Sequence, residues 1–268
     1  MKIHTKKIKV AFCIILMGSL CYTVNSYAGG WPTRKGKLLI SPSLNYFFAN
    51  KYWDSNGKVT SYEKDGSFTS AGLYMYSEYG LSKRVTLVGT GSFISNKYKQ
   101  DDFENTSTGF SDVEIGARYY LGNIKYKYYF AIQGLAVLPA YKNTATRYLG
   151  YEAAGADVRL IGSCSGKLGS KSYYFNIEGG VRQYFADQGP FQVRYFSTFG
   201  YNFAPKHQVT LSGSGVISSS TNKAFSGNLV TNKDFNYLQG TLSYGYTVNK
   251  NLVLFAGVNR FLAGFSSH

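Results

Sequence analysis

The stretch 112–121, DVEIGARYYL, alternates strictly between two kinds of side chain. The odd positions carry apolar residues, namely Val113, Ile115, Ala117, Tyr119 and Leu121. The even positions are mostly polar, charged or small, namely Asp112, Glu114, Gly116, Arg118 and Tyr120. A period of two, with one apolar and one polar face, predicts a β-strand that lies between two different environments.

The same alternation recurs along the rest of the chain. Together with 112–121 it makes eleven segments, most of them 10 to 15 residues long: 37–48, 67–80, 85–94, 126–139, 153–164, 171–185, 191–203, 207–217, 235–248 and 252–262. Strands of soluble proteins average about 5–6 residues, whereas a tilted strand that crosses a bilayer needs about 9–11. We therefore expect an all-β fold, a transmembrane antiparallel up-and-down β-barrel of about twelve strands, eleven of which are readable.

The links between these segments alternate in length. Short links at 81–84, 122–125, 165–170, 204–206 and 249–251 alternate with longer ones at 49–66, 95–109, 140–152, 186–190 and 218–234. Outer-membrane barrels have short periplasmic turns and longer extracellular loops. The pattern predicts this arrangement, with the beginning of the barrel on the periplasmic side.

The first 28 residues have the character of a secretory signal peptide. A basic start with Lys2, Lys6, Lys7 and Lys9 precedes the apolar run 10–20, and Ser26-Tyr27-Ala28 provides small residues before Gly29. This is the order of a cleavable signal. We expect residues 1–28 to be removed and residues 29–268 to form the barrel in the outer membrane. Cleavage leaves Cys164, His207 and His268 as the cysteine and histidine inventory, too small for a disulfide framework or a Cys/His zinc site.

The chain of 268 residues is strongly basic, with 29 Lys+Arg against 14 Asp+Glu and a net charge of +15. The short-link side collects eleven basic residues and no acidic one: Arg34, Lys35, Lys37, Lys83, Arg84, Lys125, Lys127, Lys167, Lys171, Lys206 and Lys250. This basic rim has two interpretations. Either it attracts anionic solutes, or its Lys and Arg side chains extend (snorkel) toward anionic lipid headgroups, and the second interpretation is favoured. Nucleic acid is a poor partner because no recognition motif accompanies the charges.

Charges within the strands are expected to face the lumen, because a charge that faces lipid is costly. They comprise Glu78, Asp112, Glu114, Arg118, Asp157, Arg159, Glu178, Arg182, Arg194 and Arg260. Asp112, Glu114 and Arg118 share one strand face, which puts Arg118 near the two carboxylates. The set either fills and rigidifies a small barrel or lines a narrow polar path, and both readings stay open.

Four segments carry a family resemblance. Gly30-Trp31-Pro32 with 35–37 (KGK), 79–87 (YGLSKRVTL), 109–119 (GFSDVEIGARY) and 155–160 (GADVRL) are similar to motifs of Gram-negative outer-membrane barrels grouped with phenol-degradation (meta-pathway) and transporter-like proteins. The resemblance implies a barrel exposed to small apolar or aromatic solutes, or a role in envelope biology. Two features depart from such barrels: eleven segments where an even number is expected, and a C-terminus, 261–268, without a terminal aromatic residue. A lost strand, a short closing strand at 261–268 or a miscounted segment would each account for them.

Evidence for enzyme chemistry is weak. His207 follows a predicted short turn, and Ser212 and Ser214 lie further along the same strand without an order that favours catalysis. We expect no catalytic site, no metal and no cofactor. The leading hypothesis is a channel or diffusion facilitator for small solutes among outer-membrane lipids. The alternative is a structural or surface-interaction barrel with a plugged lumen. The oligomeric state is left open.

Overall fold

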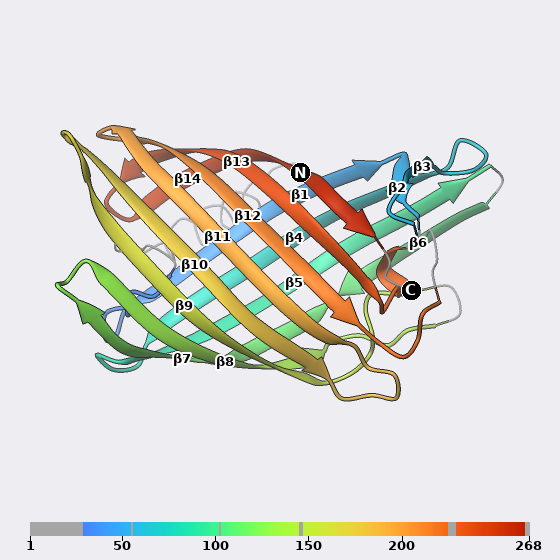
Figure 1. The fold of residues 1–268 in the computed structure, drawn as a ribbon, viewed down its shortest axis with the longest axis horizontal. Coiled ribbons are helices and arrows are strands. Elements are labelled where there is room, and N and C mark those ends of the chain that lie inside the picture. The colour runs from blue at the N-terminus through green and yellow to red at the C-terminus, as the bar shows by residue number, and fades with distance from the viewer. Residues whose placement is uncertain (1–28, 55, 102, 145–146, 225–228, 266–268) are drawn as a thin grey trace, which may run out of the picture.

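One antiparallel sheet makes up nearly the whole molecule. The computed structural model describes residues 29–54, 56–101, 103–144, 147–224 and 229–265, so the predicted signal peptide lies outside the described residues. The strands of the sheet are β1 (Leu38–Ala49), β4 (Ser67–Gly80), β5 (Val85–Gln100), β6 (Phe103–Phe110), β7 (Asp112–Ile124), β8 (Tyr128–Pro139), β9 (Gly155–Leu168), β10 (Lys171–Tyr184), β11 (Phe191–Ala204), β12 (His207–Ser219), β13 (Phe235–Asn249) and β14 (Leu252–Phe265). They lie side by side, tilted relative to the long axis, and curl into a barrel (Figure 1).

Strand neighbours in space are neighbours in sequence, as in an up-and-down barrel. The order is β1-β4-β5-β7-β8-β9-β10-β11-β12-β13-β14, and β6 pairs with β5 beside this path. The short turns gather at one end of the barrel and the longer connections at the other (Figure 1). The β9–β10 ladder continues to Lys171 opposite Leu168, so its turn is only two residues long, with Gly169 at φ 61°. Glycine adopts this left-handed conformation without steric cost.

The β5–β6–β7 region differs from the prediction. We expected a long loop at 95–109, but β5 continues to Gln100 and β6 pairs with it in register from Gln100 opposite Phe103 to Phe93 opposite Phe110. Ser95 and Thr108 share a hydrogen bond of 2.8 Å across this ladder. β7 then continues on β5, so β6 and β7 form one long strand interrupted at Ser111. The hairpin alternates polar rather than apolar residues, which is why hydrophobic periodicity alone read it as a loop.

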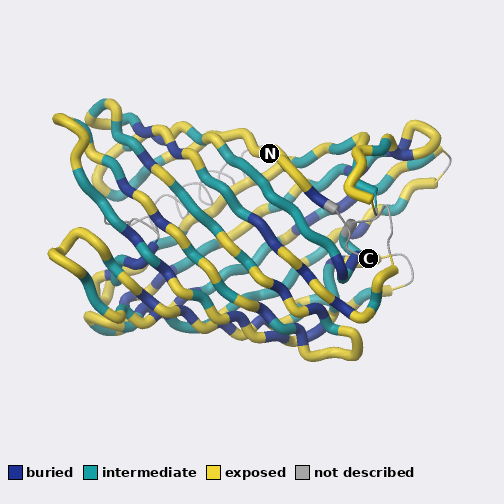
Figure 2. Tube along the Cα trace, in the orientation of Figure 1, coloured by how far each residue is buried: buried dark blue, intermediate teal, exposed yellow. Residues whose placement is uncertain are grey.

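The outer face of the barrel is apolar and exposed. Along β8 the residues alternate between exposed and buried, as Figure 2 shows along most of the tube. Outward side chains include Leu44, which is 83% exposed, and Leu160 and Leu211, which are about equally exposed at 62% and 60%. A soluble domain would bury such a belt, whereas a bilayer covers it.

The two edge strands meet without a backbone ladder in the described part of the chain. The path from β1 to β14 contains eleven strands, so antiparallel pairing at every step makes β1 and β14 run parallel to each other. Phe47 of β1 and Phe261 of β14 nevertheless touch, with ring centroids 5.4 Å apart. Gly264 of β14 lies against the Trp53 indole ring, which belongs to the small hairpin of β2 (Lys51–Trp53) and β3 (Val59–Ser61). In the described residues the two edges therefore meet through side chains near the long-loop end of the seam.

Helical structure is confined, in the residues described, to the 3-10 turn η1 (Leu229–Thr231). No helix within those residues has the length and apolar character to cross a membrane.

Candidate functional site

Nine charged side chains from five strands lie on the inner face of the barrel. We call them the charged band: Glu78, Asp112, Glu114, Arg118, Asp157, Arg159, Glu178, Arg182 and Arg194. The registers place them on one face, since Glu78 is opposite Val88, Thr86 opposite Arg118, Gln133 opposite Arg159 and Gly180 opposite Arg194. Cross-strand partners share a face of the sheet.

Glu78 and Arg118 form a buried pair that reaches over an intervening strand. Arg118 Nη1 donates to Glu78 Oε1 at 2.9 Å, although β4 and β7 are separated by β5. The residues of β5 opposite the pair, Val88 and Thr86, are small enough to let the long side chains meet above them. Arg118 also donates to Gln133 and to the Tyr76 hydroxyl, and the two charged side chains are only 4% and 1% exposed. The pair is thus compensated by hydrogen bonds as well as by opposite charge.

Residues 29–33, which we call the inner arm, lie inside the barrel against this pair. The Gly29 carbonyl accepts a hydrogen bond of 2.8 Å from Arg118, and the Gly30 amide donates to Ser163 at 2.6 Å. The Thr33 amide donates to Thr86 and its hydroxyl to Glu78. The Trp31 ring lies 6.0 Å from the ring of Tyr129. The arm therefore contacts β4, β5, β7, β8 and β9 from within.

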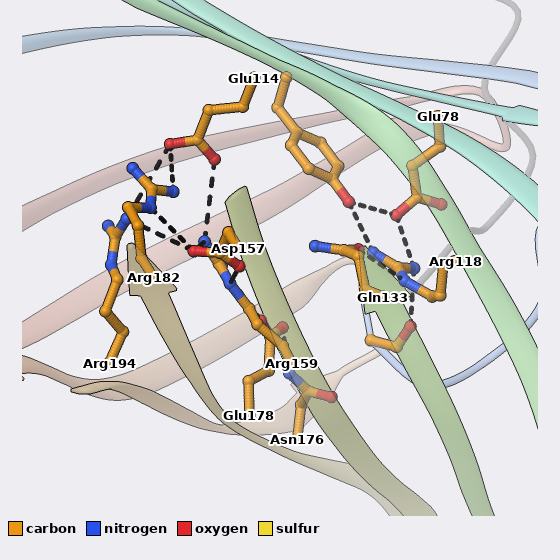
Figure 3. Close-up of polar contacts among 12 residues, drawn as sticks. Glu78, Glu114, Arg118, Gln133, Asp157, Arg159, Asn176, Glu178, Arg182 and Arg194 are labelled. Atoms are coloured by element: carbon orange, nitrogen blue, oxygen red, sulfur yellow. Dashed lines mark hydrogen bonds and ion pairs between the residues drawn. The ribbon is translucent and has the colours of Figure 1, made fainter. Parts of the chain in front are cut away.

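Asp157 is the centre of the second part of the charged band (Figure 3). Arg159 donates to both of its carboxylate oxygens, at 2.6 and 3.1 Å, and Arg182 Nε donates to Oδ2 at 2.9 Å. Arg182 extends further to Glu114 on β7, at 2.6 Å. Because β8 and β9 lie between β7 and β10, this contact spans part of the lumen.

The remaining members join at the margins of this network. Arg159 Nη1 lies 3.7 Å from Glu178, which also accepts a hydrogen bond from the Asn176 amide. The Tyr184 hydroxyl donates to Asp112 at 3.2 Å. Arg194 reaches carboxylate oxygens only at 3.8 and 4.0 Å. This second part of the band is a network of opposite charges that runs from β7 to β11, beside the Glu78–Arg118 pair of β4 and β7.

The structure places all nine members on the inner face, but Arg118 and Arg260 differ from the expectation. Arg118 pairs with Glu78 rather than with the carboxylates of its own strand. Arg182 pairs with Asp157 and Glu114, and Glu178 lies near Arg159. Arg260 was expected in the lumen. Its cross-strand partner is Gly240, which lies between the outward residues Leu238 and Leu242 of β13. Arg260 is therefore on the outer face, where it is exposed. Alternation gives the face of a residue, whereas its partner depends on tilt and side-chain reach across neighbouring strands.

A cavity of about 380 Å³ lies beside the band. Its lining includes Glu114, Arg118, Arg159, Glu178 and Arg194 together with uncharged side chains such as Thr90, Phe196, Ser214, Val216 and Tyr237. The inner face of the seam is different in character, because it is polar, neutral and accessible. Ser41, Ser43 and Asn45 of β1 and Asn259 of β14 face inward and are exposed. The sequence analysis did not single out these residues, although the spacing of 41, 43 and 45 already shows a polar face.

Six of the eleven residues of the predicted basic rim illustrate its position at the short-turn end. Arg34 and Lys35 precede β1, Lys83 and Arg84 form the β4–β5 turn, and Lys125 and Lys127 form the β7–β8 turn; all six are exposed. Arg84 Nη1 donates to the Tyr119 hydroxyl at 3.4 Å, and Lys127 Nζ lies 5.4 Å from the ring centre of Tyr128. Positive charge and aromatic rings therefore meet at this boundary, which suits a headgroup region.

The residues considered for catalysis lie on different faces of β12. His207 shares the outward face with Val209 and shares a 2.6 Å hydrogen bond with the Tyr244 hydroxyl. Ser212 and Ser214 face inward, and Ser214 lines the cavity. Strand alternation thus keeps His207 away from both serines. Within the described ranges, no three Asp, Glu, His or Cys side chains converge to hold a metal ion.

Comparisons with known proteins identify the fold. No protein-family model matches the chain, and no curated protein matches its sequence. Among solved structures, the chain is similar to the COG4313 outer membrane channel from Pseudomonas putida F1, with a TM-score of 0.61 and 14% identity over 90% of this chain and 93% of that chain. The predicted all-β barrel fold is confirmed, and the likeness is to a barrel of the outer membrane. The resemblance to the phenol-degradation group stays a prediction.

Proposed function

We propose that this protein is an outer-membrane channel, or diffusion facilitator, for small solutes. The apolar outer belt provides the contact with lipid, and a barrel similar in fold is an outer membrane channel. A signal peptide cleaved after Ala28 would direct export of the chain across the inner membrane. The short turns and the basic rim would then lie on the periplasmic side. Buried opposite charges on the inner wall fit a polar lumen better than a dry core.

One observation carries this proposal: the inner face of the seam is open to solvent. Ser43 and Asn45 face inward yet are exposed, whereas the inward residues Glu78 and Asp157 across the barrel are buried. The charged band therefore occupies one side of the lumen, and an uncharged polar wall borders the accessible side. A solute that passes along this wall meets hydroxyl and amide groups first and the fixed charges opposite. Apolar and aromatic solutes remain part of the proposal through the sequence resemblance alone.

Adjacent residues of β1 provide a matched test. Ser43→Cys and Leu44→Cys place a thiol on the inner and the outer face of the same strand, in a Cys164→Ser background that removes the remaining mature cysteine. The purified barrel is inserted into a planar bilayer and treated with a charged, membrane-impermeant thiol reagent. We expect stepwise conductance, with steps that shrink after modification of the Ser43→Cys protein and do not change for Leu44→Cys.

Absence of conductance steps from folded, inserted protein would overturn the channel proposal. Steps that respond to the reagent equally at both positions would show that conduction does not follow the lumen. Folding of each variant is checked by the shift in electrophoretic mobility that accompanies unfolding of a barrel by heat.

A second candidate is a structural or surface-interaction barrel with a plugged lumen. The inner arm favours it, because residues 29–33 bind five strands from within and the Arg182–Glu114 contact spans part of the lumen. The same recordings separate the two functions. A plugged barrel gives no steps until residues 29–33 are deleted, whereas a channel conducts with the arm in place.

A further inference from the structure

Arg194 is the guanidinium of the charged band with unused hydrogen-bonding capacity. Its Nη1 approaches Asp157 Oδ2 and Glu114 Oε1 at 3.8 and 4.0 Å, beyond hydrogen-bond distance. Both oxygens already accept from Arg182, at 2.9 and 2.6 Å. Arg118, Arg159 and Arg182 each donate to a carboxylate in the described structure, so Arg194 differs from its neighbours. The wall next to it carries a positive charge with donors left over.

The cavity of about 380 Å³ lies directly against this guanidinium. Arg194 and Phe196 come from β11, Ser214 and Val216 from β12 and Tyr237 from β13, and these five line the cavity together with Thr90 of β5. Pockets for small ligands typically measure about 300–1,000 Å³ and combine apolar walls with a few polar groups. The lining has both: a cation and three hydroxyl groups for the polar part of a ligand, and an aromatic and an aliphatic side chain beside them for its apolar part.

The acidic members of the lining restrict which anions fit. The lining carries Arg118, Arg159 and Arg194 against Glu114 and Glu178, a net charge of +1 (three minus two), so one negative charge on a ligand is compensated and a second one meets repulsion from the two carboxylates. A phosphate or a dicarboxylate would meet this repulsion in full, whereas a monocarboxylate places a single charge on Arg194. A guanidinium also matches the planar carboxylate with two parallel hydrogen bonds.

We propose that this cavity is a binding site for a small organic monocarboxylate with an apolar body. The carboxylate binds Arg194 and the neighbouring hydroxyl groups, and the apolar body packs on Phe196 and Val216. This inference rests on the proposed channel, for which it names a solute class, but binding itself does not require conduction. The site and the channel can therefore fail separately.

Calorimetric titration of the detergent-folded barrel tests the site with four probes. Benzoate has the full chemistry, benzyl alcohol lacks the charge, acetate lacks the ring and phthalate adds a second carboxylate. We expect benzoate to bind more tightly than the other three. In the Arg194→Gln protein we expect benzoate affinity to fall by about tenfold or more, because a hydrogen bond to a charged group contributes about 1.5–3 kcal/mol.

Arg260→Gln is the matched control, since it removes an arginine that is exposed on the outer face and distant from the cavity lining. We expect it to leave benzoate affinity unchanged. If Arg194→Gln does not fold, Arg194→Lys keeps the charge without the planar fork, and Val216→Phe fills part of the cavity beside Arg194; each is expected to weaken benzoate binding.

Three results would overturn the site: equal benzoate affinity in the folded Arg194 variants and the parent protein, equal loss in Arg260→Gln, or benzyl alcohol that binds as well as benzoate. Benzoate binding by a barrel that never conducts would retain the site and reject the channel. Conduction without benzoate binding would retain the channel and reject the site.

Discussion

At the scale of single residues, Glu78 and Arg118 show how this barrel keeps charge in its interior. The pair is buried; Glu78 accepts further hydrogen bonds from Tyr76 and Thr33, and Arg118 donates a further one to Gln133, so each charge has several partners. Loss of one partner leaves the other charge buried and uncompensated, which typically costs about 3–5 kcal/mol. We therefore expect Glu78→Gln to lower the free energy of unfolding by about that amount, measured by urea titration of the barrel in phospholipid vesicles.

Lys97→Gln is the control for this loss. Lys97 pairs with Glu104 at 2.7 Å on the β5–β6 hairpin, and both side chains are about half exposed, at 45% and 50%. Exposed ion pairs contribute about 1 kcal/mol or less, so we expect little change in stability. Equal losses in Glu78→Gln and Lys97→Gln would mean that solvent reaches the inner pair and that the buried charge is not what stabilises this side of the lumen.

At the scale of elements, the sequence contained the strands and their faces but not their partners. The period of two at 112–121 puts Glu114 and Arg118 on the same face, as in the structure, because alternation is a property of one strand. The Arg118–Glu78 contact crosses β5 and depends on barrel tilt and on the small Thr86 beneath it, which no local pattern encodes. The cavity and the position of the inner arm were missed for the same reason: both depend on contacts between segments far apart in the chain.

The inner arm makes an element-scale prediction. A Cβ at Gly30 would lie 3.1 Å from Ser163 Oγ, so Gly30→Cys and Ser163→Cys place two sulfurs within bonding reach. We expect the double variant, in a Cys164→Ser background, to form an intramolecular disulfide on mild oxidation, detected by mass spectrometry of the joined peptides. Gly30→Cys alone provides the control for intermolecular products. A fully reduced pair in folded protein would contradict the placement of residues 29–33 inside the barrel.

At the scale of the whole molecule, closure of the barrel is the unusual feature. Single-chain bacterial barrels have even strand numbers, which lets the first and last strands pair antiparallel. The eleven segments expected from sequence correspond to the eleven strands of the path, and β6 is only an extension beside β5. The edges β1 and β14 therefore meet parallel to each other. Unpaired backbone groups in lipid cost several kcal/mol each, so aromatic side chains alone are a weak closure.

A cysteine pair across the seam tests this closure. The rings of Phe47 and Phe261 lie 5.4 Å apart, so Phe47→Cys with Phe261→Cys, again in Cys164→Ser, should form a disulfide in the folded barrel. Phe47→Cys with Phe255→Cys is the control, because Phe255 faces inward six residues earlier on β14, about 20 Å away along the strand. We expect the first pair to cross-link and the cross-linked barrel to keep the electrophoretic mobility of the folded form up to a higher temperature.

An additional strand between β1 and β14 would separate their Cα atoms by about 9–10 Å, beyond the roughly 7 Å that a disulfide spans. Absence of the cross-link in folded protein would mean that the Cα atoms of the two edges lie more than roughly 7 Å apart, and cross-linking of the control would mean that β14 is shifted along β1.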